Sequence, residues 1–118
     1  MSARFVLKRA PDGQFSFLFL THSGQVLLTS PAYTDKERAL RRISAARQMA
    51  RNRHNYEIVT GANGSSFLVR GKHGDVLGQS ESFPDAQSLE AGINLVRANA
   101  KGARLEDLTP TASFLREV

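Results

Sequence analysis

The chain contains no cysteine, and no run of apolar residues approaches the roughly 18 that a membrane-spanning helix requires. Without cysteine the protein has no disulfide framework, no thiol chemistry and no thiolate metal site. The first residues, MSARFVLKRAP, lack the apolar core of a signal peptide. We therefore expect a cytoplasmic protein without a membrane partner.

Motifs of the common catalytic and cofactor sites are also missing. The chain has no nucleophile elbow and no acid–base pair with a reason for shifted pKa values. Its three histidines have no obvious converging carboxylate, so we expect no metal site. These absences predict a protein that is not an enzyme, with no catalytic residues and no bound cofactor. Four glycines match neither the Walker sequence nor the dinucleotide fingerprint, and turns explain them: Gly61, Gly64, Gly71 and Gly74.

Positive charge is concentrated in the first half of the chain. The 118 residues, enough for one compact domain, carry a net charge of +5. Residues 1–55 hold ten Lys and Arg against three Asp and Glu, whereas residues 56–118 hold six against eight. Such an asymmetry indicates a polyanionic partner for the first half, although solubility alone also explains it.

One short segment occurs twice, as GQVLLTS at residues 24–30 and as GDVLGQS at residues 74–80. Upstream of the first turn the offset between the copies changes from 50 to 51, which aligns Phe5 with Tyr56. A period near fifty residues indicates a duplicated supersecondary unit. Further identical pairs at the offset of fifty are Asp35/Asp85, Ile43/Ile93, Arg47/Arg97 and Ala50/Ala100.

Two turn sequences predict how the first strands of each unit pair. APDGQ suits a three-residue hairpin loop with its glycine in the left-handed conformation, which places Leu7 opposite Phe17. ANGS suits a two-residue type I′ loop at Asn63-Gly64, which places Ile58 opposite Val69. The change in loop length matches the change in offset between the two copies.

Each unit is predicted to contain three strands followed by a helix. The sequence Thr34-Asp35-Lys36-Glu37 is a capping box that opens the first helix, which ends near Ala50. The second helix runs from about residues 83–85 to Asn99, and residues 103–108 form a last strand. The remaining strands lie near residues 3–9, 14–21, 25–30, 56–61, 66–71 and 75–80.

The first copy resembles the YegP-like family, small bacterial proteins of unknown function built from one or two such units. The resemblance lies in a strand, the turn DGQF, a second strand, the segment GQVLLTSPAYTDK and the helical segment RRISAARQMA. GDVLGQSESF, AGINLVRANA and LEDLT in the second copy are similar as well, so the resemblance covers about residues 3–109. It implies an α+β fold in which two β3-α-β units form one antiparallel sheet, with exchanged terminal strands and both helices on one face. The resemblance implies no catalytic residues for this chain.

This resemblance and the repeat predict a single domain over residues 1–109. Its two repeats span about residues 3–53 and 54–109. We expect them to fold together, because fifty residues alone bury little apolar surface. Residues 110–118 have no counterpart in the first half, and we expect them to form a loose tail.

The two faces of the predicted sheet differ in composition. One face carries most aromatic side chains, and stacked aromatics can bind single-stranded nucleic acid. Two amphipathic helices nevertheless need an apolar sheet face to cover, so we assign this face to the core. Its members are Phe5, Leu7, Phe15, Phe17, Phe19, Tyr56, Ile58, Phe67 and Val69.

The opposite face mixes polar residues with aliphatic ones. Glu57 and Arg70 are predicted to form a cross-strand ion pair there. A solvated face of an antiparallel sheet is mostly polar, so contiguous aliphatic residues indicate a partner or self-association. The candidate interface residues are Val6, Leu18, Leu20, Val59 and Leu68.

The first helix also carries a cluster of arginines. Arg38, Arg41 and Arg42 point away from its apolar stripe, and Arg51 lies on its flank. A guanidinium group binds two phosphate oxygens at once, so these residues are candidates for nucleic-acid binding, although a solvated helix face has the same composition.

Two functions of different classes remain. The first is a non-catalytic interaction module that binds a protein partner, or a second copy of the chain, through the uncovered sheet face. The alternative is sequence-nonspecific nucleic-acid binding through the basic first helix. A small-molecule enzyme has no motif in its support.

Overall fold

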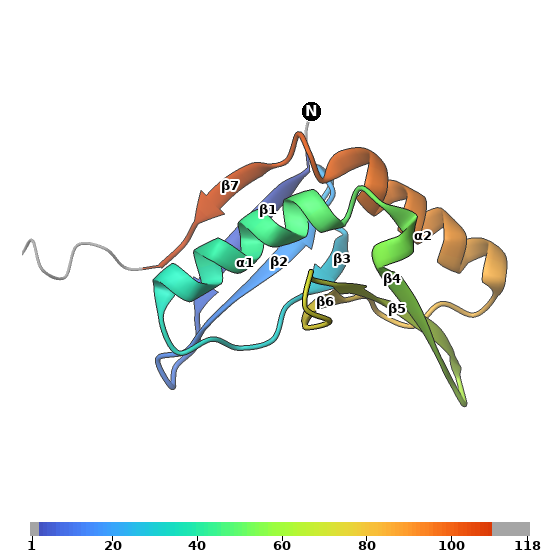
Figure 1. The fold of residues 1–118 in the computed structure, drawn as a ribbon, viewed down its shortest axis with the longest axis horizontal. Helices are drawn as coiled ribbons and strands as arrows, with labels where there is room; N and C mark the ends of the chain where they lie inside the picture. Colours follow the sequence, from blue (N-terminus) through green and yellow to red (C-terminus); the bar gives the residue numbers. More distant parts are fainter. Residues whose placement is uncertain (1–2, 110–118) are drawn as a thin grey trace, which may run out of the picture.

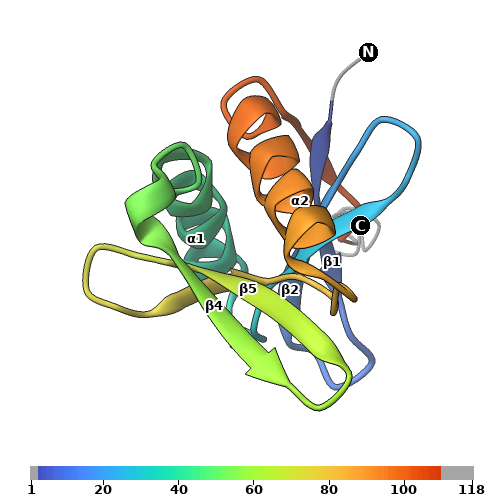
Figure 2. The ribbon, with the colours of Figure 1, turned by 90° about the vertical axis from the view of Figure 1, so that its right-hand side faces the viewer.

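The computed structural model describes residues 3–109, in which seven strands form one sheet with two helices on one face (Figures 1 and 2). The predicted α+β fold is confirmed, whereas the predicted tail, residues 110–118, lies outside the described residues. The strands are β1 (Arg4–Arg9), β2 (Phe15–Leu20), β3 (Val26–Thr29), β4 (Tyr56–Gly61), β5 (Gly64–Arg70), β6 (Val76–Gln79) and β7 (Arg104–Asp107). The helices are α1 (Lys36–Met49) and α2 (Ala86–Asn99), and a 3-10 turn (Arg53–Asn55) precedes β4. Within residues 3–109 neither helix is long and apolar enough to cross a bilayer.

The two repeats meet at the centre of the sheet, whose strand order is β4-β5-β6-β3-β2-β1-β7. Here β3 and β6 run antiparallel and pair through Thr29 and Gln79. These two residues are equivalent at the offset of fifty, so an approximate twofold axis relates the repeats at this seam.

The last strand makes the sheet mixed rather than wholly antiparallel, because β7 runs parallel to β1. After α2 has carried the chain back over the sheet, the Arg104 N–H donates to the Ala3 carbonyl (3.0 Å) beside the start of β1. From this point β7 follows β1 in the same direction, and only a long crossover such as α2 permits such a pairing. The second repeat therefore gives its terminal strand to the first repeat, as the resemblance implied.

The first hairpin has the predicted register, with Leu7 opposite Phe17. Its loop is closed by a hydrogen bond from the Ala10 N–H to the Gln14 carbonyl (2.8 Å), and Gly13 has a φ of 89°. Local turn chemistry was therefore sufficient to predict this pairing.

The second hairpin is shifted by two residues from the prediction, because Ile58 lies opposite Phe67 and not opposite Val69. A type I′ turn at Asn63-Gly64 requires a positive φ at both residues, and only Gly64 has one, at 133°. The loop therefore lies one residue earlier in the chain. A shift of two residues keeps every side chain on its predicted face.

Both helices have an aspartate as their N-cap residue. Asp35 accepts a hydrogen bond from the Arg38 N–H (2.7 Å), and Asp85 accepts one from the Ser88 N–H (2.8 Å). The N-cap of α1 is therefore Asp35, so the predicted capping box of Thr34 and Glu37 does not form.

The predicted core face is buried beneath the helices, except that Phe15 is half-buried and Ile58 is exposed. Ile58 is 42% exposed, because β4 is an edge strand that reaches past the helices (Figure 2). The aromatic and aliphatic sheet residues that are fully buried include Phe5, Leu7, Phe17, Phe19, Phe67 and Val69. The helices bury Ala39, Ile43, Ala46, Leu89, Ile93 and Val96 against them.

Arginines at the helix ends connect the two repeats. Arg47, in the last turn of α1, donates to three carbonyl groups just past α2, and its guanidinium group lies 5.1 Å from the centroid of the Phe5 ring. The equivalent Arg97 of α2 donates to the Arg51 carbonyl (3.4 Å) past the end of α1. Each helix thus places a cation at the C-terminal end of the other, where the helix dipole favours it.

Asp107 connects the exchanged strand β7 to the start of α1. Its carboxylate lies 2.7 Å from the Lys36 ammonium group and accepts hydrogen bonds from the Thr109 N–H (2.9 Å) and hydroxyl (2.6 Å). Burial acts to raise the pKa of Asp107, but the hydrogen bonds from Lys36 and Thr109 outweigh it and lower the pKa to about 2.

The lowered pKa of Asp107 predicts a loss of stability in acid. A carboxyl group whose folded-state pKa lies below its ordinary value of 3.8 stabilises the protein above that pH and ceases to do so as the pH falls towards 2. Asp107→Asn should lower the free energy of unfolding at neutral pH by about 1 kcal/mol, less than full linkage gives, because the pair is about one third exposed. Urea unfolding curves of parent and variant should differ at pH 7 and converge near pH 2.

A matched control for this prediction is Glu106→Gln, which removes the ion pair of Arg4 with a more exposed carboxylate on the same strand (46% against 34% for Asp107). It should change stability little at either pH. Unfolding curves for Asp107→Asn that stay parallel to the parent curves down to pH 2 would contradict the assignment.

Candidate anion-binding surface

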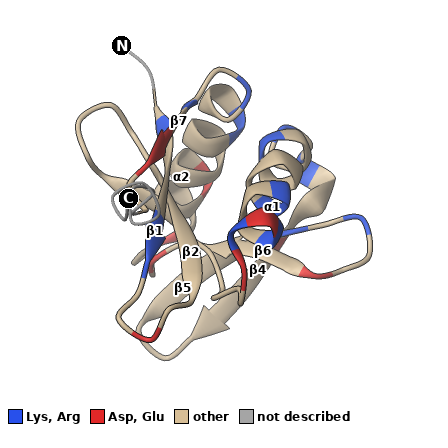
Figure 3. Cartoon of the chain, turned by 90° about the vertical axis from the view of Figure 1, so that its left-hand side faces the viewer, with Lys and Arg blue, Asp and Glu red and all other residues tan. Residues whose placement is uncertain are grey.

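Three of the arginines predicted to bind nucleic acid share one face of α1. Arg38, Arg41 and Arg42 are separated by three and four residues, which places their side chains on the same side of a helix. The buried stripe of α1 faces the sheet, so the arginines point away from the core. Arg38 and Arg41 are exposed, and Arg42 is half-buried. Figure 3 shows this concentration of Lys and Arg on α1.

A loop from the second repeat lies beside these arginines and completes a cleft. Residues 71–75, between β5 and β6, face α1 across a cleft of about 400 Å³, a volume typical of small-ligand sites. Within its lining, Arg41, Arg42 and Lys72 carry positive charge and Asp75 is the single carboxylate. The other lining residues are Ser44, Ala45, Gln48, Met49, Gly71 and His73.

Two arginines of this surface have carboxylate partners. Arg42 Nη1 lies 2.5 Å from Asp75 Oδ2, and this ion pair links α1 to the loop. Arg41 Nη1 lies 3.1 Å from Glu37 Oε2, but the two side chains are 63% and 82% exposed. Water competes strongly for such an exposed pair, so Arg41 is free to exchange Glu37 for another anion.

Arg38 and Lys72 have no ion-pair partner among residues 3–109. Arg38 lies outside the cleft lining, on the same face of α1 as Arg41. The surface at and beside the cleft thus carries three exposed cations, Arg38, Arg41 and Lys72, against one exposed glutamate. The arrangement can hold an anion through several charged donors, and a planar guanidinium group can contact two oxygens of one phosphate.

The twofold arrangement forms an equivalent cleft in the other half of the molecule, but without the charges. It lies between α2 and the loop at residues 21–25, with a volume of about 350 Å³. Because this second cleft exists without cations, the fold does not require them in the first. The charged and histidine positions of the first cleft have these equivalents: Arg41/Ala91, Arg42/Gly92, Lys72/His22, His73/Ser23 and Asp75/Gln25. Of these equivalents, Ala91 and Gly92 do not line the second cleft.

The two repeats also differ at Tyr33, whose equivalent in the second repeat is Phe83. The Tyr33 hydroxyl group is buried and has no hydrogen-bond partner among the described residues. Burial raises the pKa of Tyr33, while Arg42 lowers it and Asp75 raises it by smaller amounts. The equivalent Phe83 has no hydroxyl group and packs against Gly92.

Arg51, the fourth predicted residue, does not line the cleft. It lies just past the end of α1, roughly 20 Å along the helix from Arg38 at about 1.5 Å per residue. Conversely, Lys72 and Asp75 were not predicted as site residues. The repeat offered a signal for them, because both differ in charge from their equivalents in the first unit.

The candidate interface residues lie on the uncovered sheet face, but most are inaccessible. Val6, Leu20 and Leu68 are only 5–8% exposed, and Leu18 is half-buried. Val59, on the edge strand β4, is 40% exposed. The two hairpins therefore present little accessible aliphatic surface on this face.

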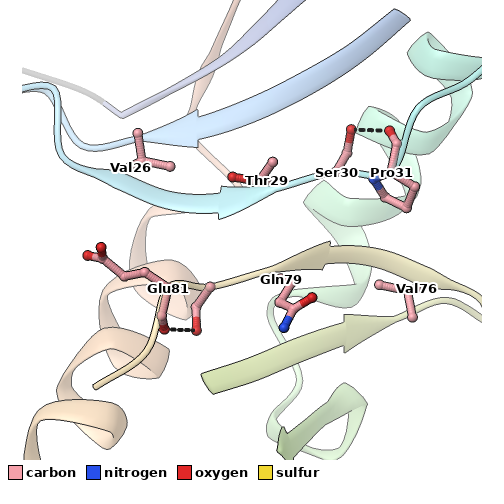
Figure 4. Close-up of a pocket in the computed structure, with 8 residues that line it drawn as sticks. Val26, Thr29, Ser30, Pro31, Val76, Gln79 and Glu81 are labelled. Carbon is pink, nitrogen blue, oxygen red and sulfur yellow. Dashed lines mark hydrogen bonds between the residues drawn. The ribbon is translucent and has the colours of Figure 1, made fainter. Parts of the chain in front are cut away.

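A groove of about 360 Å³ follows the seam between β3 and β6 on this face (Figure 4). Ser30 and Ser80 accept hydrogen bonds from the Phe17 N–H (2.8 Å) and the Phe67 N–H (2.9 Å). Both hydroxyl groups therefore bind backbone groups of the sheet. The groove is lined by four equivalent pairs: Val26/Val76, Thr29/Gln79, Ser30/Ser80 and Pro31/Glu81.

Comparisons with known proteins decide the family. No protein-family model matches the chain. A UPF0339 protein of Pseudomonas aeruginosa, PA0329, is 34% identical over 108 residues, which cover 91% of this chain and 98% of that protein. The UPF0339 protein YegP of Escherichia coli is 32% identical over 110 residues, which cover 92% of this chain and all of that protein. The chain belongs to the UPF0339 family.

Solved structures of UPF0339 proteins share this fold. The solution NMR structure of Escherichia coli YegP, a protein of unknown function, has a TM-score of 0.87 at 32% identity and covers 94% of this chain and 97% of that one. The UPF0339 protein SO3888 of Shewanella oneidensis has a TM-score of 0.86 at 26% identity, with coverage of 92% and 93%. The family and fold that the repeated motifs implied are confirmed.

Proposed function

We propose that this UPF0339 protein is a non-catalytic binding module for polyanions, which binds nucleic acid without sequence preference. The binding site is the basic surface, formed by Arg38, Arg41, Arg42 and Lys72. One observation carries the proposal: cations from both repeats converge beside one cleft, whereas the equivalent cleft is neutral. Contacts to phosphate carry no sequence information, so binding through this surface is sequence-nonspecific.

The residues of the basic surface have different tasks in this proposal. Arg38, Arg41 and Lys72 are exposed and bind the phosphate groups. Arg42 is held by Asp75, and their ion pair keeps the loop at residues 71–75 next to α1. Arg41 releases Glu37 when it binds phosphate, at little energetic cost because that pair is exposed.

The test removes the exposed cations and leaves the ion pair of Arg42 intact. Arg38→Gln, Arg41→Gln and Lys72→Gln in one chain should weaken binding to every sequence of random duplex and single-stranded DNA. Each phosphate contact releases condensed counterions, so the slope of log affinity against log salt should decrease by about one unit for each lost contact. Fluorescence anisotropy at low and moderate salt measures both effects.

A matched control removes equal charge from other surfaces. Lys8, Lys101 and Arg104 are exposed and lie outside the cleft lining, and their triple glutamine variant should retain most of the affinity and the salt slope. Absence of DNA binding by the parent protein at low salt would contradict the proposal. Equal losses in the two triple variants would show that net charge, and not the basic surface, governs binding.

A protein interaction through the uncovered sheet face is the second candidate, and the groove at the seam favours it. Val26, 39% exposed, and Val76 supply apolar surface at its two ends, beside the exposed Thr29 and Gln79 (Figure 4). Val26→Lys should leave the fold intact and abolish an interaction at this seam. Association that is insensitive to Val26→Lys would exclude the groove as its site.

A further inference from the structure

The two edges of the sheet differ in how they are protected against pairing with another strand. The edge strand β7 has four residues, of which Arg104, Glu106 and Asp107 are charged, and such short charged edges resist pairing. The other edge, β4, has six residues in regular register, without proline, lysine or bulge. Its sole charge, Glu57, is paired with Arg70 (2.6 Å).

The exposed part of β4 has the composition of a strand that pairs. Residues 57–61 are all exposed, and Ile58, Val59 and Thr60 are β-branched residues that favour strands. Ile58 lies on the helix side of the sheet and Val59 on the uncovered side, with exposed fractions of 42% and 40%. The β4–β5 hairpin reaches beyond both helices, so another strand can approach this edge (Figures 1 and 2).

Hydrogen bonds of β5 show which backbone groups of β4 are free. Ser65 exchanges backbone hydrogen bonds with Phe83 (3.0 and 2.7 Å), on the side of β5 away from β4. The Phe67 carbonyl accepts a hydrogen bond from the Ser80 N–H (2.9 Å), and the Phe67 N–H donates to the Ser80 hydroxyl oxygen (2.9 Å), on the same side of β5. Residues in an antiparallel strand bond alternately to one neighbour and the other, so Ser65 and Phe67 are not bonded to β4.

Thr60 lies opposite Ser65, and Ile58 lies opposite Phe67. Both are therefore in non-hydrogen-bonded pairs, and their N–H and C=O groups point to the free edge of the sheet. Tyr56 has the same orientation, but its N–H already donates to the Arg53 carbonyl of the 3-10 turn. Ile58 and Thr60 thus carry the complete pairs of free backbone groups on this edge.

We infer that the β4 edge pairs antiparallel with β4 of a second copy of this chain, with Val59 on the twofold axis. In this register Ile58 of each copy exchanges two hydrogen bonds with Thr60 of the other, which uses all the free groups of both residues. Val59 then faces Val59 of the second copy in a close non-hydrogen-bonded pair. Glu57 faces Gly61 of the second copy, so no like charges meet.

A second copy fits this edge because the strand is complementary to itself. The alternative register, with Ile58 on the axis, pairs Thr60 with Tyr56, whose N–H is occupied. The twofold axis of the preferred register is perpendicular to the sheet, so both helical layers lie on the same side of the joined sheet. The β4–β5 hairpin of each copy reaches beyond its helices, which separates the two helical layers. Edge pairing buries less surface than a stable dimer requires, so the dimer is weak and forms only at high concentration.

Sedimentation velocity or light scattering of the complete chain over a wide concentration range tests this inference. The apparent mass of the parent should rise towards twice that of the monomer. Val59→Lys opposes two positive charges on the axis, and Thr60→Pro removes an N–H that has no partner in the monomer. Both variants should remain monomeric and keep the parent circular dichroism spectrum. In the parent, exchange of the Ile58 and Thr60 amide protons should slow as concentration rises.

Three control variants distinguish the β4 edge from other surfaces. Val59→Thr keeps a neutral β-branched residue, Leu105→Lys alters the opposite edge and Val26→Lys alters the seam groove, and all three should dimerise like the parent. A parent protein that stays monomeric at all concentrations would overturn the inference. So would dimers that survive Val59→Lys and Thr60→Pro, or dimers that are lost only in Val26→Lys, which would place the contact on the sheet face.

Discussion

Neither residues 1–53 nor residues 54–118 should fold alone, whereas the complete chain should unfold in a single transition. The first half lacks β7, the outer neighbour of β1, and α1 packs against β5 and β6 of the second half. The second half lacks Arg47, which donates to the carbonyl groups past α2. Each half would therefore expose core residues that only the other half covers, and fifty residues bury too little apolar surface to compensate.

The measurement compares the two halves, separately and mixed, with the complete chain. Each isolated half should give a collapsed amide region in its NMR spectrum, and an equimolar mixture should recover dispersion, since the halves supply each other's missing strands. Thermal unfolding of the complete chain should give the same midpoint by near- and far-ultraviolet circular dichroism. Dispersed spectra from either half alone, or two separate transitions, would contradict this prediction.

Replacement of Gly64 by alanine should lower the free energy of unfolding by about 3 kcal/mol or more, one of the largest effects of any single substitution here. Gly64 has a φ of 133°, which an L-residue rarely adopts, and an added Cβ would lie directly against the Phe83 carbonyl group. That carbonyl group accepts the Ser65 N–H (3.0 Å), so the backbone cannot move aside without loss of this bridge.

Gly74→Ala is the matched control for this substitution. Its φ of 83° also lies in the left-handed region, but an added Cβ would meet no atom within 4 Å. Only backbone strain remains, which costs about 1 kcal/mol. Equilibrium unfolding in urea should therefore separate the two variants by about 2 kcal/mol. Equal stabilities would mean that the hairpin loop adjusts to the Cβ and that the contact with Phe83 is unimportant.

The sequence alone was sufficient for the repeat, the positions of the strands and helices, the register of the first hairpin and the arginine face of α1. The offset of fifty identified two equivalent units, and alternating or helical apolar periods located their strands and helices. The register of the first hairpin followed from its turn sequence, because three loop residues determine which residues face each other. The arginine face of α1 followed in the same way from helical spacing.

Features that join distant segments were decided by the tertiary structure. The second hairpin contains Gly61 and Gly64 on either side of Asn63, and its loop formed at residues 62–63, with Gly64 packed against the Phe83 carbonyl group, a contact outside the hairpin. The direction of β7 depended on where α2 ended over the sheet. The exposure of Ile58 depended on how far the helices extend over β4.

Part of the candidate site was likewise predictable from the sequence, and part depended on the tertiary structure. Helical period alone placed Arg38, Arg41 and Arg42 together, because their separation is fixed by the geometry of one helix. Only packing of α1 against the second repeat placed Lys72 and Asp75 beside them, across about thirty residues of sequence. Local patterns determine periodicity and turns over a few residues, whereas the cleft and its charge depend on contacts that form only when both repeats have folded into one sheet.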